Sequence, residues 1–264
     1  MNMNPKRLFF FDIDHTLYYN EQKEILSQTK KLLIRLSQNP NNILGIATGR
    51  SYRGTRVLKE LTPLFKYFVV LNGAITYEGD KIIQDTPISS KDVIELNQKA
   101  LEKQILVVNV EAQKKGILEQ KDPDSQQFMQ DIIAKKTSKA FNLLNLDKPI
   151  YKMNLSHANH EVIVEFLKDF PQLHAYFWKN GVVSLSAKQV NKAYGIQPIQ
   201  QKYPDYQLIG IGDGCNDIEM FQAAHLSIVM NNTKYPYLKK IAHLIAPTIE
   251  DNQLYAFFVQ HGLV

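Results

Sequence analysis

RLFFFDIDHT, residues 7–16, joins an apolar segment to a pair of aspartates. The segment Arg7–Phe11 predicts a strand, because it is short, apolar and rich in aromatic residues. In an extended chain, residues two apart point to the same side, so Asp12 and Asp14 can face one small volume. Open α/β sheets bind their ligands at the carboxyl ends of the strands. The stretch therefore predicts a ligand site where this strand ends.

Two carboxylates this close repel each other unless a cation or a shared proton lies between them. A hard, oxygen-preferring cation such as Mg²⁺ would satisfy both Asp12 and Asp14. The alternative is a pair of aspartates that only stabilise turns, which is a common use of this residue type. This motif by itself leaves both interpretations open.

Two later segments carry polar groups at the ends of other predicted strands. IATGR, residues 46–50, offers the Thr48 hydroxyl and tight backbone N–H groups, which suit the oxygens of a phosphate. Alternatively, Thr48 only caps the helix that follows. GIGDGCND, residues 210–217, brings two more carboxylates and an amide to the same predicted sheet edge.

Strands and helices alternate up to residue 84 and again after residue 190, which indicates βα units around a parallel sheet. The predicted strands are Arg7–Phe11, Ile43–Ala47, Phe68–Leu71, Gln207–Ile211 and Leu226–Met230, with a hairpin of Ile75–Tyr77 and Lys81–Ile83. The predicted helices cover Ile25–Leu36, Ser51–Leu61, Lys192–Lys202, Asp217–Ala224 and Glu250–His261.

The middle of the chain has a different order of predicted helices and strands. Here we predict helices over Ser89–Lys103 and Glu161–Leu167, strands over Ile105–Val110, Ile150–Leu155, Leu173–Trp178 and Val182–Ser186, and further helix after the polar stretch Asp122–Asp124. Asn180-Gly181 indicates an antiparallel hairpin between the last two strands. A βα domain interrupted by an α+β module is the simplest account.

Composition restricts the class of protein. The net charge of +5 lies within residues 1–84, where 12 Lys and Arg face 7 Asp and Glu, without the dense basic stripe of nucleic-acid binders. The longest apolar runs, such as Leu8–Phe11, are too short to span a membrane. The single cysteine, Cys215, excludes an internal disulfide and is typical of a reducing cytosol. We therefore expect a cytoplasmic protein that binds neither nucleic acid nor membrane.

The polar segments, taken in order, carry a resemblance. Asp12-x-Asp14-x-Thr16, Thr48-Gly49-Arg50, Lys192 and Gly212-Asp213-x-x-Asn216-Asp217 resemble the four motifs of the haloacid dehalogenase superfamily. The insert between the second and third motifs is similar to that of subclass IIB, the Cof-type phosphatases. The resemblance covers essentially the whole chain, including Leu71–Ala74 and Ile249–Asn252. His15 departs from it, because the family most often has glycine at that position.

The resemblance implies an α/β fold, with a Rossmann-like parallel-sheet core over residues 1–84 and 187–264 and an inserted α+β cap domain over residues 85–186. It implies a Mg²⁺-dependent phosphatase that hydrolyses a small phosphorylated metabolite, either a sugar phosphate or a phosphorylated cofactor, through an aspartyl-phosphate intermediate. Its implied catalytic residues are the nucleophile Asp12 and the general acid and base Asp14, and its implied phosphate-binding residues are Thr48, Gly49, Lys192 and Asn216. The implied metal ligands are Asp12, Asp14 through its backbone carbonyl, and Asp213, supported by Asp217 from outside the ligand shell.

Elementary chemistry agrees with these implied roles. Phosphoryl transfer depends mainly on positioning and charge neutralisation, which a divalent cation and one lysine can provide. Lys188 lies four residues before Lys192 and would share its face of a helix, but Lys192 matches the motif position better. His157 and His160 lack a nearby third ligand, so we expect no second metal there.

Two other functions stay open at this stage. A phosphomutase on the same core would return the phosphoryl group to a second hydroxyl instead of releasing it to water. A non-catalytic metabolite-binding protein on this fold is the other alternative, although every charge-bearing motif position is intact.

Overall fold

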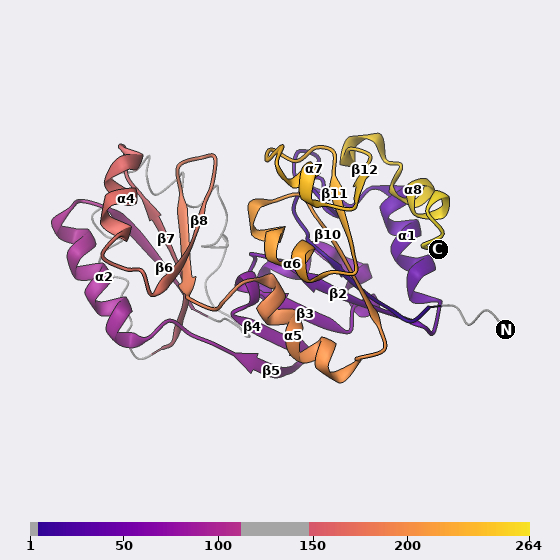
Figure 1. The fold of residues 1–264 in the computed structure, drawn as a ribbon, viewed down its shortest axis with the longest axis horizontal. Coiled ribbons are helices and arrows are strands. Elements are labelled where there is room, and N and C mark those ends of the chain that lie inside the picture. The colour runs from indigo at the N-terminus through magenta and orange to yellow at the C-terminus, as the bar shows by residue number, and fades with distance from the viewer. Residues whose placement is uncertain (1–4, 112–147) are drawn as a thin grey trace. The chain divides into compact units, whose positions relative to one another are not determined.

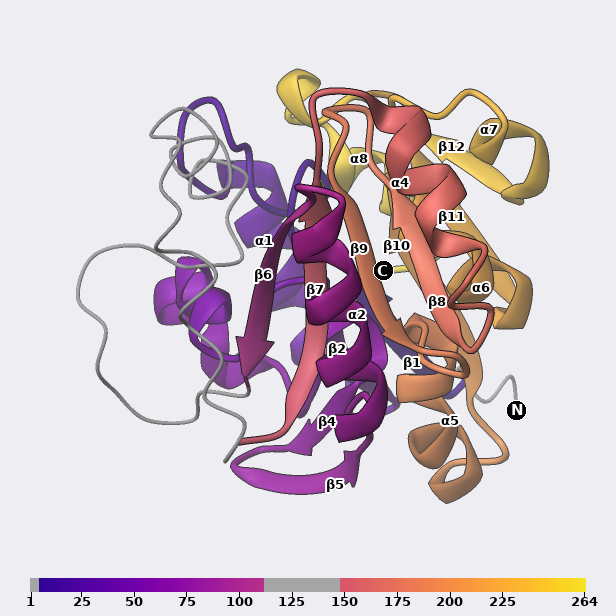
Figure 2. The same ribbon diagram turned by 90° about the vertical axis from the view of Figure 1, so that its left-hand side faces the viewer.

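The computed structural model describes residues 5–111 and 148–264 (Figures 1 and 2). The chain forms two compact units. The first comprises Met1–Gly49, Thr55–Gln84 and Asn191–Val264, and the second comprises Arg50–Gly54 and Asp85–Val190. The helix expected after the polar stretch Asp122–Asp124 lies outside the described residues.

An eight-stranded sheet forms the centre of the first unit. Its order is β12 (Leu244–Ala246), β11 (Leu226–Met230), β10 (Gln207–Gly212), β1 (Arg7–Phe11), β2 (Asn42–Ala47), β3 (Tyr67–Val70), β4 (Ile75–Glu78) and β5 (Lys81–Asp85). The pairs from β12 to β3 are parallel, and β4 runs antiparallel to β3. The predicted α/β fold with a mostly parallel sheet is confirmed.

Strand β1 lies inside this sheet because its side chains are apolar on both faces. Phe9 and Phe11 face one side, where their ring centroids lie 6.2 and 6.4 Å from that of Phe258. Phe10 faces the other side and packs in a cluster that includes Ile196. All three phenylalanines of β1 are fully buried. Such a continuous apolar run is what a strand covered on both faces requires.

The helices of the first unit are short. They are α1 (Ser27–Ser37), α5 (Lys192–Lys202), α6 (Ile218–Ala223), α7 (Leu238–Ile241) and α8 (Leu254–Gln260), with 3₁₀ segments at Leu71–Gly73, Cys215–Asp217 and Ile249–Asp251. A further 3₁₀ segment, Arg53–Leu64, belongs to this unit from Thr55 onward. Helix α1 packs against α8, which carries Phe258 (Figure 1). Helices α5 and α6 supply Ile196 and Met220 to the cluster on the opposite face of the sheet.

Two predicted helices of this unit were wrong in kind or extent. Instead of an α-helix over Ser51–Leu61, the chain forms the 3₁₀ segment Arg53–Leu64, which is interrupted at Lys59 (φ 49°) and contains Pro63. Proline removes a backbone donor and opposes a regular helix. The single helix expected over Glu250–His261 is divided by Asn252, whose left-handed backbone (φ 50°) ends the 3₁₀ turn before α8 begins.

Helix α5 starts and continues for identifiable reasons. The side chain of Asn191 accepts a hydrogen bond from the backbone N–H of Tyr194 at 2.8 Å, and this N-cap makes Lys192 the first helical residue. Pro198 inside the helix has no N–H to donate to the Tyr194 carbonyl four residues earlier. The side chain of Gln84 donates to that carbonyl instead, at 3.3 Å.

The second unit contains a four-stranded antiparallel sheet in the order β6 (Leu106–Glu111), β7 (Ile150–Ser156), β9 (Val183–Ala187) and β8 (Leu173–Phe177). Helices α2 (Ser90–Glu102) and α4 (His160–Leu167) pack through Leu96 and Ile163 into one core with Met153 and Leu185. Ser89 caps α2 by accepting from the Asp92 N–H at 3.1 Å. The α+β character of this segment is confirmed.

Within the part of the chain that the structure describes, no helix has both the length and the apolar content needed to cross a membrane.

Candidate active site

The candidate site is built where three parallel strands of the first unit end. Strands β10, β1 and β2 are neighbours in the sheet. Asp12 follows β1, Thr48 follows β2 and Asp213 follows β10. Because parallel strands end at the same edge, their adjacency brings three segments that are distant in sequence to one edge of the sheet.

Lys192 links two of the carboxylates by ion pairs. Its Nζ lies 2.8 Å from Oδ1 of Asp12 and 2.6 Å from Oδ1 of Asp217. Lys192 and Asp217 are fully buried, and Asp12 is only 6% exposed. Burial alone would lower the pKa of Lys192, but the charges of the two aspartates outweigh it and raise the pKa above its usual value. The ammonium therefore stays protonated.

Asp217 is fully occupied by contacts within the protein. Its Oδ2 accepts hydrogen bonds from the backbone N–H groups of Asp213 at 3.0 Å and Gly214 at 2.8 Å, while Oδ1 receives Lys192. The turn depends on Gly212, where a Cβ would meet the Asp217 carboxylate at 2.3 Å. Asp217 thus orients both the turn that carries Asp213 and the lysine.

Asp12, Asp213 and Asp217 form an acidic cluster, in which one carboxylate oxygen from each lies within 4.8 Å of the others. Burial is the main cause that raises the pKa of Asp12 to about 7; the Lys192 ammonium opposes the shift and Asp217 adds to it. Burial, followed by the charge of Asp12, raises the pKa of Asp213 well above its usual value. Full ionisation of the cluster is therefore unfavourable.

The charge of this acidic cluster fits a divalent cation. Three ionised carboxylates and one ammonium carry a net charge of −2 (−3 + 1), which a divalent ion would neutralise. Closely spaced carboxylate oxygens are also the ligands that Mg²⁺ prefers. Among the described residues this is the one group of three or more acidic, histidine or cysteine side chains close enough to share an ion.

The second aspartate of the first motif has a partner of its own. Oδ1 of Asp14 accepts a hydrogen bond from Nδ2 of Asn20 at 2.7 Å, and the charge of Asp14 acts on Asp12. His15, the residue after Asp14, has a left-handed backbone (φ 53°), a conformation that glycine adopts most easily. Its backbone N–H donates to Oδ1 of Asn20 at 3.3 Å, and its carbonyl accepts from Asn232 at 2.9 Å.

The predicted phosphate-binding residues other than Lys192 lie around the same edge. Thr48 is fully buried after β2, and Gly49 follows it. Asn216 is buried in the turn between β10 and α6, and its Nδ2 donates to Oδ1 of Asn72 at 2.9 Å. The three residues thus come from the ends of two different strands of the same sheet.

Two polar residues that contact Asp213 were not predicted as site residues. The Thr16 hydroxyl donates to Oδ1 of Asp213 at 3.2 Å, and the Thr233 hydroxyl donates to its backbone carbonyl at 2.6 Å. Thr16 was visible inside the first motif. Thr233 could have been found from the polar run after β11, because that strand neighbours β10.

Other candidates lie elsewhere. Lys188 donates to the carbonyl of Pro171 at 2.7 Å within the second unit. His157 bonds through Nδ1 to the backbone of Asn159, and the ring of His160 packs edge-on against Phe177. None of the three joins the acidic cluster.

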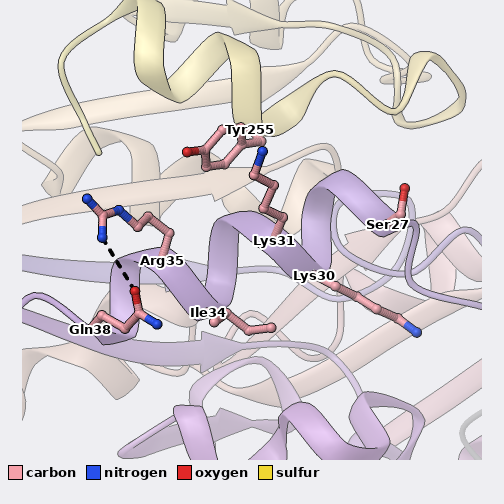
Figure 3. A pocket seen from close by; sticks show the side chains of 7 residues that line it. All are labelled: Ser27, Lys30, Lys31, Ile34, Arg35, Gln38 and Tyr255. Atoms are coloured by element: carbon pink, nitrogen blue, oxygen red, sulfur yellow. Dashed lines mark hydrogen bonds between the residues drawn. The ribbon is translucent and has the colours of Figure 1, made fainter.

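A surface groove of about 440 Å³ runs along α1 beside α8 (Figure 3). Lys31 lies over the ring of Tyr255, 4.2 Å from its centroid, and the Arg35 guanidinium bonds to Gln38. None of its lining residues belongs to the four motifs. The groove is a basic surface feature separate from the candidate site.

Known proteins resemble this chain over nearly its full length. A "Putative phosphatase" of Buchnera aphidicola is 26% identical and covers 88% of this chain and 89% of its own. A "Putative phosphatase" of Mycoplasma pneumoniae is 27% identical, and the match covers 89% of this chain and 88% of that protein.

Solved structures share the fold. The subclass IIB sugar phosphatase BT4131 superposes with a TM-score of 0.80 at 23% identity, covering 98% of this chain and 100% of that one. The phosphatase BT1666 of Bacteroides thetaiotaomicron superposes with a TM-score of 0.80 at 19% identity, covering 98% of this chain and 96% of that one. The model of the haloacid dehalogenase-like hydrolase family matches residues 9–258. The resemblance seen in the motifs is therefore confirmed, and the chain belongs to the haloacid dehalogenase-like hydrolases.

Proposed function

We propose that this protein is a Mg²⁺-dependent phosphatase that hydrolyses small phosphorylated metabolites through an aspartyl-phosphate. One observation carries the proposal: a carboxylate at the end of β1, Asp12, lies 2.8 Å from the buried ammonium of Lys192 and within the acidic cluster. Catalysis of phosphoryl transfer depends mainly on a positioned nucleophile and on neutralisation of charge. This arrangement can supply both.

Asp12 acts as the nucleophile. Its carboxylate oxygen attacks phosphorus, the ester P–O bond breaks, and the leaving alkoxide takes a proton from Asp14. A water molecule then attacks phosphorus and gives a proton to Asp14, and the bond between phosphorus and Asp12 breaks. Inorganic phosphate leaves, and both carboxyl groups return to their starting state.

The phosphoryl group is held by Thr48, Gly49, Lys192 and Asn216. The Lys192 ammonium stays charged beside Asp12 and so can offset the negative charge of the phosphoryl oxygens. Thr48 and Gly49 follow β2, and Asn216 lies in the turn after β10, so their donors come from strands on either side of Asp12.

Mg²⁺ would be held by the carboxylates of Asp12 and Asp213 and by the backbone carbonyl of Asp14, while the Asp217 carboxylate supports Asp213 by accepting a hydrogen bond from the Asp213 backbone N–H. When bound, the ion neutralises charge on the phosphoryl oxygens and on the Asp12 carboxylate. Asp217 itself already receives Lys192 and two backbone N–H groups, which favours an orienting role over direct coordination.

The substrate is a sugar phosphate or a phosphorylated cofactor, and the likeness to a sugar phosphatase supports the first of these. Residues 85–186 act as a cap domain that excludes water and selects the leaving group. A cytoplasmic location agrees with the single cysteine of the chain.

The test is release of inorganic phosphate from a panel of sugar phosphates and phosphorylated cofactors, with and without Mg²⁺. We expect Mg²⁺-dependent release by the wild type and none by Asp12→Asn, which keeps the shape of the side chain but not its nucleophilic charge. A wild type that releases no phosphate from any member of the panel would refute the proposal. An isomerised phosphate ester without free phosphate would identify a mutase instead.

A further inference from the structure

The turn Leu71–Gly73, directly after β3, has an unusual backbone. Its three successive residues all have positive φ, 52° at Leu71, 58° at Asn72 and 99° at Gly73. Leucine in particular rarely adopts this conformation. Leu71 and Asn72 are nevertheless almost fully buried. Backbone strain of this kind persists only where the surrounding structure holds it, and it gathers at functional sites.

The turn contacts three segments of the candidate site. The backbone N–H of Asn72 donates to the Thr48 carbonyl at 3.0 Å, and Oδ1 of Asn72 accepts from Nδ2 of Asn216 at 2.9 Å. Gly73 lies against the start of α5, since a Cβ there would meet the Asn191 carbonyl at 2.0 Å. Asn191 is the N-cap of α5, and the next residue is Lys192. One strained turn therefore contacts the second and fourth motifs and the residue directly before Lys192.

The amide of Asn72 controls the direction of the amide of Asn216. A side-chain NH₂ group has two N–H donors. The Asn72 oxygen accepts one of them, so the amide of Asn216 is held with its nitrogen toward Asn72, and the second N–H of that nitrogen is the donor that the proposed function assigns to a phosphoryl oxygen. Both side chains are at least 96% buried, so water does not easily replace this bond.

The geometry points to Asn72 as a positioning residue for phosphoryl transfer: its left-handed backbone aims Oδ1 at Asn216 and thereby sets the phosphate-binding orientation of that amide. The inference rests on the proposed function of Asn216. Asn72 acts through Asn216 and is not itself in contact with the reacting atoms.

The discriminating variant is Asn72→Gly, because glycine accepts the positive φ and removes only the amide. Asn252→Gly is the matched control. Asn252 also has a left-handed backbone (φ 50°) and a hydrogen-bonded amide, but its partners are Gln28 and Ser27, outside the four motifs.

We expect Asn72→Gly to lower kcat/KM and to weaken inhibition by inorganic phosphate by about tenfold each, the effect of one buried hydrogen bond. Asn252→Gly should change both by less than about twofold, even where thermal unfolding shows an equal loss of stability. Introduced into Asn216→Ala, the Asn72→Gly change should have no further effect on kcat/KM, because its target is already absent.

Two results overturn the inference in an active enzyme: Asn72→Gly behaves like Asn252→Gly, or its effect adds fully to that of Asn216→Ala. A wild type without phosphatase activity refutes the proposed function separately. In that case, the positioning role is tested by calorimetry, which measures the binding of inorganic phosphate in the presence of Mg²⁺. Weaker binding by Asn72→Gly than by Asn252→Gly supports the positioning role, while equal binding or none refutes it.

Discussion

Nζ of Lys192 lies 2.8 Å from Oδ1 of Asp12, although one residue opens a helix late in the chain and the other follows the first strand. The pair is almost completely removed from solvent, and the second contact of the ammonium, with Asp217, is equally buried. Lys192 therefore supplies positive charge in direct contact with two carboxylates of the acidic cluster.

Replacing that lysine should cost both stability and activity. In Lys192→Met, Asp12 and Asp217 would stay buried without their cation, which typically destabilises a protein by about 3–5 kcal/mol. Urea denaturation measures this free energy of unfolding, and phosphate release should be lost in parallel. Lys188→Met is the control, because its exposed ammonium bonds only to the Pro171 carbonyl and should change stability by about 0.5 kcal/mol or less. Equal behaviour of the two variants would contradict the role of Lys192.

Binding of Mg²⁺ should depend on pH around neutrality. Burial raises the pKa of Asp12 to about 7, so the ion must displace a proton from a large part of the molecules at pH 6 and from few at pH 8. The affinity for Mg²⁺ should therefore rise with pH over this range, with protons released on binding. Titration calorimetry in two buffers of different ionisation enthalpy counts these protons. An affinity that is constant from pH 6 to pH 8 would contradict the expectation.

Glu78 should contribute stability that disappears in acid. The hydrogen bond from Lys202, at 2.8 Å, is the main cause that holds the pKa of Glu78 below 4.5, and Tyr67 adds a second at 3.1 Å. Since the folded-state pKa is depressed, the contribution is present above pH 4.5 and is lost as the pH falls through the folded-state value.

Glu78→Gln should therefore lower the free energy of unfolding at pH 7 by about 1 kcal/mol or less, because the group is partly exposed to solvent. The difference from the wild type should shrink as the pH falls below 4.5, through the depressed folded-state pKa of Glu78. Urea denaturation at several pH values measures it, with the exposed Asp205→Asn as a control of equal charge change. A difference that persists unchanged in acid would exclude the ionic explanation.

Asn20 should matter for catalysis through Asp14. Its Nδ2 donates to Oδ1 of Asp14 at 2.7 Å and so orients the carboxyl group proposed to move the proton. Asn20→Ala should lower kcat by about tenfold with little change in KM, because proton transfer acts on the transition state rather than on binding. Steady-state kinetics measure the two constants. Asn39→Ala is the control: it removes an amide of the same size whose oxygen accepts from the Asn41 backbone N–H at 3.0 Å, away from the four motifs, and it should leave both constants unchanged. Equal effects of the two variants would refute the role of Asn20.

The regular elements were largely predictable because their patterns are local. Strand β1 has the predicted bounds Arg7–Phe11, and α5 begins and ends at Lys192 and Lys202 as predicted. The errors occur where a residue with positive φ interrupts a predicted helix: Lys59 inside the 3₁₀ segment and Asn252 between two helical turns. Positive φ at such residues is held by their surroundings and leaves little trace in composition.

The amino-acid sequence was sufficient to establish the α/β class, the family and the residue types of the candidate site, because apolar periodicity and motif spacing are properties of the chain itself. The tertiary structure alone revealed which groups touch: Lys192 between Asp12 and Asp217, Asn20 on Asp14, and Asn72 on Asn216. These contacts join residues on different strands and helices. Strand order and burial set their distances, and neither can be read from the order of residues along the chain.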